Sequence, residues 1–158
     1  MNSKLNPYYI VGLVDGEGCF CVSLNRKDSS KPEVRLLFEI ELRADDKEIL
    51  ERVKRTLDCG NIYYLNYERY KKWKPHYKYK VSNIVDISTK VIPFFKKYPL
   101  QAKKKKSFEI FCKVAEMILD RNHLTTEGIE KVKLLREGLK RDSPGALDAH
   151  AGWGGTGF

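Results

Sequence analysis

The sequence predicts an α+β domain of two layers, in which helices cover one face of a four-stranded antiparallel sheet. A helical segment is followed twice by a pair of segments in which apolar and polar residues alternate, giving the order α-β-β-α-β-β-α before further helix. Each predicted strand therefore has one apolar face, which helices have to cover. With 158 residues the chain is long enough for one domain with a substantial core and short for two.

The first predicted helix begins near residue 7, with Asn6 placed as its N-terminal cap and Pro7 as its first residue. Gly12 lies in its middle, where glycine costs about 1 kcal/mol relative to alanine. That cost is acceptable if a second helix packs closely at this point, because a missing side chain lets two helix backbones touch. We therefore interpret Gly12 as the contact point of a helix pair.

The same segment ends in an acidic tip flanked by glycines. Gly16 and Gly18 are expected to break the helix and to leave Glu17 at its C-terminal end. A carboxylate is unfavourable at the negative end of a helix dipole unless a positive charge compensates it. Because hard cations bind carboxylate and carbonyl oxygens, the tip predicts a divalent metal site.

Two strands follow, over residues 19–26 and 33–43, joined by a polar turn. The apolar faces consist of Phe20, Val22 and Leu24 in the first strand and of Val34, Leu36, Phe38, Ile40 and Leu42 in the second. The outward faces consist of Cys19, Cys21, Ser23 and Asn25, and of Glu33, Arg35, Leu37, Glu39, Glu41 and Arg43.

The rest of the chain repeats this pattern and then becomes helical. An amphipathic helix is predicted over residues 45–57, strands over 61–67 and 76–82, and helices over 84–97, 103–119 and 127–140. Thr126 is expected to cap the last helix. The helix over 103–119 is expected to be buried through Phe108, Phe111, Cys112, Ala115 and Leu119.

The final segment differs in composition from everything before it. Residues 142–158 contain no Lys or Arg and hold five of the 11 glycines. We interpret residues 1–141 as the domain and residues 142–158 as a flexible glycine-rich tail without chemistry of its own.

The charge of the chain indicates a polyanionic partner. Lys and Arg number 30 against 21 acids, which gives a net charge of +9. Nucleic acid is the commonest such partner and an anionic membrane surface the next. No apolar run approaches the roughly 20 residues of a spanning helix, and neither a signal peptide nor a membrane partner is expected.

A basic and aromatic segment strengthens the case for nucleic acid. From Tyr67 to Lys80, six basic residues are interleaved with five aromatic ones. In the predicted fourth strand, the inward side chains are Tyr77, Tyr79 and Val81, and the outward ones are His76, Lys78 and Lys80. Since a β-ribbon fits the major groove of DNA, outward side chains can reach base edges.

Individual outward side chains match particular bases. Arg35 suits guanine, Asn25 suits adenine, and Glu39 suits the amino group of cytosine. Glu33 and Glu41 are interpreted instead as solvated surface side chains. The four cysteines are expected to be free thiols in a reducing compartment, because Cys19 and Cys21 share a strand face but have no matching second pair for zinc.

A second basic run, Lys103 to Lys106, opens the predicted helix over 103–119. Four lysines at a helix start oppose the helix dipole, so they are not explained by helix stability. We interpret most of them as a solvated patch that positions phosphates.

Residues 10–18, Ile-Val-Gly-Leu-Val-Asp-Gly-Glu-Gly, resemble the nine-residue signature of the LAGLIDADG homing endonucleases. Glycine at the third place, aspartate at the sixth, an acid at the eighth and glycine at the ninth all match that motif. The resemblance extends over nearly all of residues 5–140. It implies the LAGLIDADG fold, whose open sheet face forms a saddle for DNA, and a Mg²⁺-dependent double-strand break in a long, nearly palindromic DNA site.

The resemblance also assigns roles to residues. Glu17 would be the catalytic acid and, with the carbonyl of Gly16, a metal ligand, while Asp15 would be a structural cap. Lys103 stands best for the basic residue near the active centre, with Lys104 as the alternative, and Leu42 or Arg43 stands where the family often has a polar group. DNA would contact Cys21, Ser23, Asn25, Lys27, Arg35, Leu37, Glu39, Arg43, Tyr63, Tyr67, Lys78 and Lys80.

The number of motifs sets the expected assembly. One chain has one motif helix, and single-motif members of the family act as homodimers, so Tyr9, Gly12 and Leu13 are predicted to form the dimer interface. Two alternatives remain open: an intron-splicing, maturase-type protein that binds RNA, and a non-catalytic DNA-binding protein of the same fold. The resemblance suggests a mitochondrial or chloroplast location, although no residue indicates one.

Overall fold

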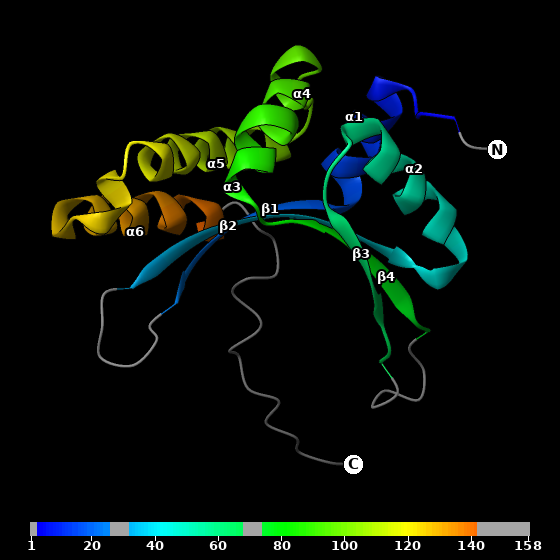
Figure 1. Cartoon of the computed structure of the whole chain (residues 1–158), viewed down its shortest axis with the longest axis horizontal. Helices are drawn as coiled ribbons and strands as arrows, with labels where there is room; N and C mark the ends of the chain where they lie inside the picture. Colours follow the sequence, from blue (N-terminus) through cyan, green and yellow to red (C-terminus); the bar gives the residue numbers. More distant parts are fainter. Residues whose placement is uncertain (1–2, 26–31, 68–73, 142–158) are drawn as a thin grey trace, which may run out of the picture.

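A computed structural model describes residues 3–25, 32–67 and 74–141 of the chain. Four antiparallel strands form one curved sheet in the order β1-β2-β4-β3, and the helices lie together on one side of it (Figure 1). The predicted two-layer α+β architecture, with one sheet face left open, is therefore confirmed. The predictions for Lys27 and for the tail over 142–158 concern positions outside the described residues.

The bounds of the elements are close to those expected from the sequence. The first half comprises α1 (Pro7–Glu17), β1 (Gly18–Asn25), β2 (Glu33–Arg43), a 3₁₀ turn η1 (Ala44–Asp46) and α2 (Lys47–Leu57). The second half comprises β3 (Asn61–Leu65), β4 (His76–Val81), α3 (Ile84–Asp86), the π-helical turn η2 (Ile87–Val91), α4 (Ile92–Lys97), α5 (Lys104–Leu119), η3 (Asn122–Leu124) and α6 (Thr126–Arg141).

The strand register confirms the predicted faces. Phe20 lies opposite Phe38 across β1 and β2, and Phe38 lies opposite Val81 across β2 and β4. These three side chains are buried, as are the other inward residues at the middle of the sheet. Because successive side chains of a strand alternate between its faces, this register leaves the polar partners on the open face.

Aromatic packing joins the sheet to the helices. The ring of Phe20 stacks on Phe38 with centroids 5.0 Å apart. On its helix side it meets Phe95 of α4 at 5.7 Å and Phe108 and Phe111 of α5 at 5.3 and 5.2 Å. Aromatic pairs of this kind add about 0.5–1.5 kcal/mol each to the free energy of burial. The centre of the core therefore lies between β1, β2, α4 and α5.

The two ends of α1 explain its position. The side chain of Asn6 accepts a hydrogen bond from the backbone nitrogen of Tyr8 at 2.9 Å, so the predicted cap is confirmed. The helix continues through Gly16 to Glu17, so the expectation that Gly16 breaks it is wrong. Gly18 ends it in extended backbone, and a β-carbon there would lie 2.6 Å from Cγ1 of Val14. Space rather than backbone conformation therefore requires glycine at position 18.

Two expectations about the C-terminal helices are also wrong. Leu119, expected in the core, is 54% exposed, and it is the last residue of α5. The cap of α6 is Thr125 rather than Thr126, since the Thr125 hydroxyl accepts a hydrogen bond from the backbone nitrogen of Gly128 at 3.0 Å.

Candidate functional site

The acidic tip of α1 is the first part of the candidate site. Glu17 is the last residue of α1, its side chain is exposed, and β1 begins at the next residue without a connecting loop. A carboxylate and the neighbouring backbone carbonyls are suitable oxygen ligands for a hard divalent cation. Among the described residues, no three His, Cys, Asp or Glu side chains gather in a metal-binding group. In the described part of one chain, the acidic tip is therefore not joined by further acidic, histidine or cysteine ligands.

Asp15 joins this tip to the beginning of α5. Its two carboxylate oxygens accept hydrogen bonds from the backbone nitrogens of Gln101, at 2.9 Å, and Ala102, at 3.2 Å. Both oxygens are thus used inside the fold, which confirms that Asp15 is structural. The contact fixes the lysine run that follows Ala102 relative to Glu17.

Within that run, the structure brings Lys104 to the tip. The ammonium nitrogen of Lys104 donates a hydrogen bond to the carbonyl oxygen of Gly18 at 2.5 Å, and its side chain is half-buried. Lys103, the preferred candidate from the sequence, precedes the first residue of α5 and has an exposed side chain. The assignment of the basic residue to Lys103 stays a prediction, and Lys104 is the lysine whose contact with the tip is visible.

The outer side of α1 presents an apolar stripe with small residues. Tyr9 is 49% exposed, and Leu13 is half-buried. A β-carbon added at Gly12 or Gly16 would meet no atom within 4 Å. The two glycines are therefore not required by contacts in the described part of this chain, and the stripe has space for another helix.

The open face of the sheet brings together the described side chains predicted to contact DNA. The register places Ser23 opposite Arg35, Cys21 opposite Leu37, and Tyr63 opposite Lys78. The same face carries Asn25, Glu39, Arg43 and Lys80, and Tyr67 reaches it from the segment after β3. Arg35 is half-exposed and forms an ion pair with Glu33 at 3.0 Å.

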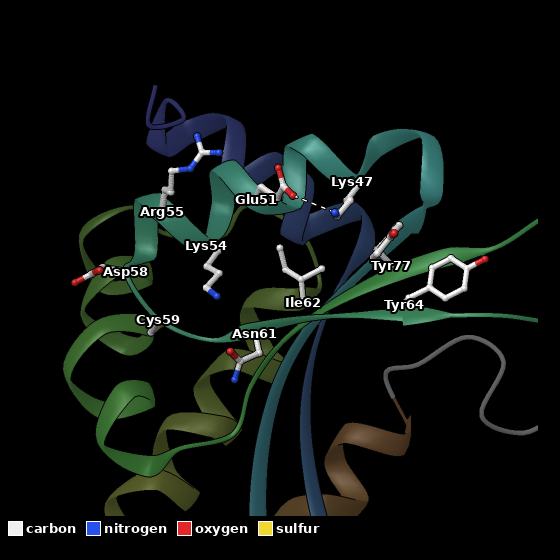
Figure 2. A pocket seen from close by; sticks show the side chains of 10 residues that line it. All are labelled: Lys47, Glu51, Lys54, Arg55, Asp58, Cys59, Asn61, Ile62, Tyr64 and Tyr77. Carbon is white, nitrogen blue, oxygen red and sulfur yellow. Dashed lines mark ion pairs between the residues drawn. The ribbon is translucent and has the colours of Figure 1, made fainter. Parts of the chain in front are cut away.

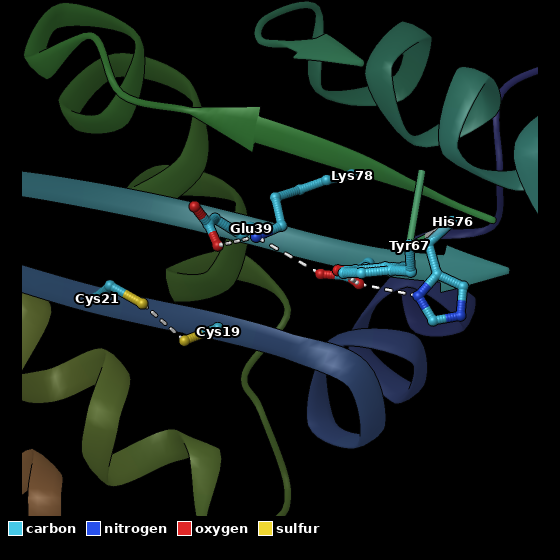
Figure 3. A network of polar contacts seen from close by, with 7 residues as sticks. Cys19, Cys21, Glu39, Tyr67, His76 and Lys78 are labelled. Atoms are coloured by element: carbon cyan, nitrogen blue, oxygen red, sulfur yellow. Dashed lines mark hydrogen bonds and ion pairs between the residues drawn. The ribbon is translucent and has the colours of Figure 1, made fainter. Parts of the chain in front are cut away.

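A polar network organises the part of this face formed by β2 and β4 (Figure 3). One oxygen of Glu41 accepts a hydrogen bond from the Tyr67 hydroxyl at 2.6 Å and lies 2.9 Å from Nδ1 of His76. Lys78 lies 3.2 Å from Glu39 and 3.5 Å from the second oxygen of Glu41. Partial burial opposes ionisation of Glu41, but the hydrogen bonds from Tyr67 and His76 and the charge of Lys78 lower its pKa.

This network corrects one interpretation. Glu41, interpreted as a solvated side chain, is half-buried and holds three partners. The alternation pattern placed it on the correct face but gave no information about Tyr67, which comes from a segment 26 positions away. The signal that was available is the pair of acids Glu39 and Glu41, at alternate positions of β2, opposite Lys80 and Lys78 of β4.

The two thiols of β1 lie beside this network. The sulfur atoms of Cys19 and Cys21 are 2.8 Å apart, and all four cysteines are free, as predicted. The hydrogen bond from Cys21 and, after it, the charge of Lys104 lower the pKa of Cys19 to about 7 against the opposing effect of partial burial.

A separate cavity lies away from the predicted site residues. It measures about 870 Å³ and lies beside α2 and β3, where Lys47 forms an ion pair with Glu51 and its ammonium lies 5.1 Å from the centre of the Tyr77 ring (Figure 2). Its walls carry both signs of charge, and none of the predicted site residues lines it. In the described part of the chain, no helix is long and apolar enough to cross a membrane.

Comparisons with known proteins agree on one family. The family model described as LAGLIDADG endonuclease matches residues 10–115. A probable intron-encoded endonuclease of Neurospora crassa is 31% identical over 135 residues, which are 85% of this chain and 24% of the relative. A probable intron-encoded DNA endonuclease of Mycosarcoma maydis is 33% identical over 104 residues, which are 66% of this chain and 35% of the relative.

Solved structures give the same match. The I-SmaMI LAGLIDADG homing endonuclease bound to cleaved DNA has a TM-score of 0.78 and 30% identity, over 91% of this chain and 47% of that chain. I-SmaMI bound to uncleaved DNA in the presence of calcium ions has a TM-score of 0.77 and 32% identity, over 87% of this chain and 46% of that chain. The chain thus spans about a quarter to a third of these curated relatives and less than half of the solved chains.

The contacts of Asp15 lead to a stability prediction. Asp15→Ala leaves the backbone nitrogens of Gln101 and Ala102 without their partners, and loss of a capping carboxylate of this kind costs about 1–2 kcal/mol. We expect the free energy of unfolding, measured by urea denaturation, to fall by that amount. Asp45→Ala is the control, because the Asp45 side chain is 71% exposed and pairs with Arg43 at the surface. Equal effects of the two changes would contradict the structural role.

Proposed function

Because this chain belongs to the LAGLIDADG endonuclease family, we propose that it provides one half of a homing endonuclease that binds double-stranded DNA and hydrolyses a phosphodiester bond in each strand. The observation that carries the proposal is the position of Glu17. This exposed acid ends α1 at the point where β1, the first strand of the open face, begins. A bound duplex would thus be recognised and cleaved by adjacent residues of one rigid segment.

The acid and the lysine at the tip have complementary tasks. Glu17, with the carbonyl of Gly16, would hold a divalent metal, Mg²⁺ in this proposal, which supplies charge neutralisation and water activation when bound. Lys104, fixed against the Gly18 carbonyl, would place a positive charge beside the phosphate and stabilise the charge that develops during hydrolysis. Lys103 would contact the phosphate backbone from the start of α5.

The open face would provide sequence recognition. Its alternating outward side chains form a curved β-surface, and paired strands of this kind fit the major groove as a two-stranded ribbon. Arg35, with its planar guanidinium, suits guanine, whereas Glu39 and Glu41 hold Lys78 in a defined position. The basic excess of the chain would supply the salt-dependent part of the affinity.

Two acidic tips are needed to cut two strands, so a second motif helix has to pack against α1. We propose that a second copy of this chain supplies it, through the stripe of Tyr9, Gly12 and Leu13. The solved relatives are about twice as long as their match to this chain, so a second unit of similar size fits the assembly of the family. The fungal, intron-encoded relatives support an organelle genome, the mitochondrial one in this proposal, as the origin.

Glu17→Gln is expected to abolish cleavage while leaving DNA affinity in Ca²⁺ unchanged, because the amide keeps the shape of the side chain but removes its charge. The measurements are a Mg²⁺-dependent cleavage assay and a binding titration on the same duplex. Full cleavage of both strands by Glu17→Gln would remove this residue from the metal site.

The same assay separates the two lysines. Lys104→Ala is expected to lower the cleavage rate by about 10²–10³, the usual loss when one preorganised donor is removed. Lys103→Ala serves as its neighbour control and is expected to change affinity more than rate. The reverse pattern would restore Lys103 as the active-centre lysine.

The protein is expected to sediment as a dimer at micromolar concentration, and Gly12→Leu is expected to dissociate it by overpacking the contact between helices. The variant should not destabilise the single chain, because space surrounds Gly12 and leucine is a better helix former than glycine by about 1 kcal/mol. Lys131→Leu, at an exposed position of α6, controls for the added leucine. A monomeric wild-type protein that still cuts both strands would overturn the dimer.

Base recognition and phosphate contact are distinguished by two further variants. Arg35→Ala is expected to change the sequence profile of cleaved sites at one position of each half-site, at a cost of about 1–3 kcal/mol. Lys105→Ala, on α5, is expected to weaken binding to all sequences alike and to lower the salt slope by about 1. A cleavage screen with randomised half-sites measures both. An unchanged profile for Arg35→Ala would show that β2 is not the reading strand.

A further inference from the structure

His76, the first residue of β4, has no function in the proposal above. Its side chain lies on the open face and is 24% exposed. Nδ1 of its ring lies 2.9 Å from an oxygen of Glu41, and Nε2 points away from that contact (Figure 3). In the described part of the chain Nε2 has no hydrogen-bond partner, and it is not sealed from solvent. One polar atom of this ring is therefore available to a ligand that covers the face.

Glu41 determines which nitrogen of the neutral ring carries the hydrogen. Partial burial raises the pKa of Glu41, but the hydrogen bonds from Tyr67 and His76 and the charge of Lys78 lower it overall. The carboxylate is therefore ionised near neutral pH, and an ionised carboxylate only accepts hydrogen bonds. The contact with His76 consequently requires a hydrogen on Nδ1, which leaves Nε2 of the neutral ring as an acceptor.

Tyr67 restrains the same ring. Its hydroxyl donates a hydrogen bond, at 2.6 Å, to the oxygen of Glu41 that His76 contacts. The rings of Tyr67 and His76 meet edge to face, with centroids 5.3 Å apart and an interplanar angle of 78°. The direction of Nε2 is thus set before a ligand arrives, so little side-chain entropy is left to be lost on binding.

The charged surroundings allow the ring to exist in both protonation states. The described titratable and charged groups that face it are Glu41 and Arg43 on β2, Asp45 after β2, Lys78 on β4 and Tyr67 after β3. Arg43 lies opposite His76 but is paired with Asp45 at 2.7 Å, and Lys78 is paired with Glu39 and Glu41. Because both cations are compensated and a carboxylate contacts the ring, a proton on Nε2 does not create an unbalanced charge.

We propose that His76 is a specificity-determining residue for DNA recognition, with Glu41 as its positioning residue. Neutral His76 accepts a hydrogen bond at Nε2, so it selects a base with an amino group in the major groove, adenine or cytosine. Protonated His76 donates from the same atom, so it favours guanine, which presents two neighbouring acceptors there.

The two states make base preference depend on pH. Histidine is the side chain whose charge ordinarily changes between about pH 5 and about pH 8. The base preferred at one position of each half-site should therefore change from adenine or cytosine to guanine as the pH falls. This inference rests on the proposed function, since it places DNA on the open face, whereas the tautomer of His76 does not depend on DNA.

The tautomer is tested on the free chain by nitrogen NMR of the imidazole rings. Above about pH 8 we expect the Nδ1–H form of His76. Glu41→Gln is expected to shift it toward the Nε2–H form that free histidine prefers. His123, in η3, is the reference in the same spectra and should not respond to Glu41→Gln. A wild-type His76 in the Nε2–H form would overturn the proposal.

Base preference is measured with duplexes randomised in each half-site and selected by binding in Ca²⁺, so that cleavage does not contribute. We expect wild type at about pH 8 to favour adenine or cytosine at one position by about fivefold or more, and guanine to gain by a similar factor at about pH 6. His76→Gln and Glu41→Gln should each lose this change with pH. His123→Gln is the matched control and should keep it. Circular dichroism verifies that each variant is folded.

The outcomes separate this inference from the proposed function. Absence of sequence-selective binding by the wild type at either pH would contradict DNA on this face, and with it base reading by His76. Selective binding with no change of preferred base, or a change that persists in His76→Gln, would overturn the role of His76 and leave the proposed function intact. A change that persists only in Glu41→Gln would overturn the positioning role of Glu41.

Discussion

The cluster of phenylalanine rings between the sheet and its helices is the contact on which the rest of the structure depends. Phe20 lies at its centre and touches rings from β2, α4 and α5. Because the helices pack against this single apolar layer, they lie together on one side of the sheet (Figure 1). The opposite face is then free for polar side chains, and the acidic tip of α1 is held at the edge between the two faces.

The parts that the sequence predicted well are those governed by local periodicity. The alternation of apolar and polar residues in β1 and β2 defined both faces of the sheet. Once the apolar residues of a strand mark the buried face, the residues between them must lie on the other face. Asn6 and Pro7 marked the start of α1 through capping chemistry. The errors occurred at helix ends. Thr125 and Thr126 are chemically equivalent caps, and Leu119 continues the apolar period of α5 to its last residue, where the side chain is exposed.

The candidate site was predictable to the extent that it lies in one segment. The motif alone indicated Glu17, Gly12 and Asp15 as candidates, because all three lie in one short segment of the chain. The contacts of Asp15 with Gln101 and of Lys104 with Gly18 each join residues 86 positions apart. No local pattern distinguishes Lys104 from Lys103, since the choice depends on how α5 packs against β1. The organising role of Glu41 was missed for the same reason.

The direct passage from α1 into β1 has a consequence for how such a protein could change its target. No loop separates Glu17 from the first strand residue, and Gly18 is packed too tightly against Val14 to accept a side chain. Under the proposed function, the connection would therefore fix the distance between the reacting phosphate and the bases read along β1. Under the proposed function, substitutions toward the far ends of the strands can alter which sequence is recognised, while the offset between that sequence and the cut stays constant. Specificity would then be free to evolve without any change in the pattern of the ends produced.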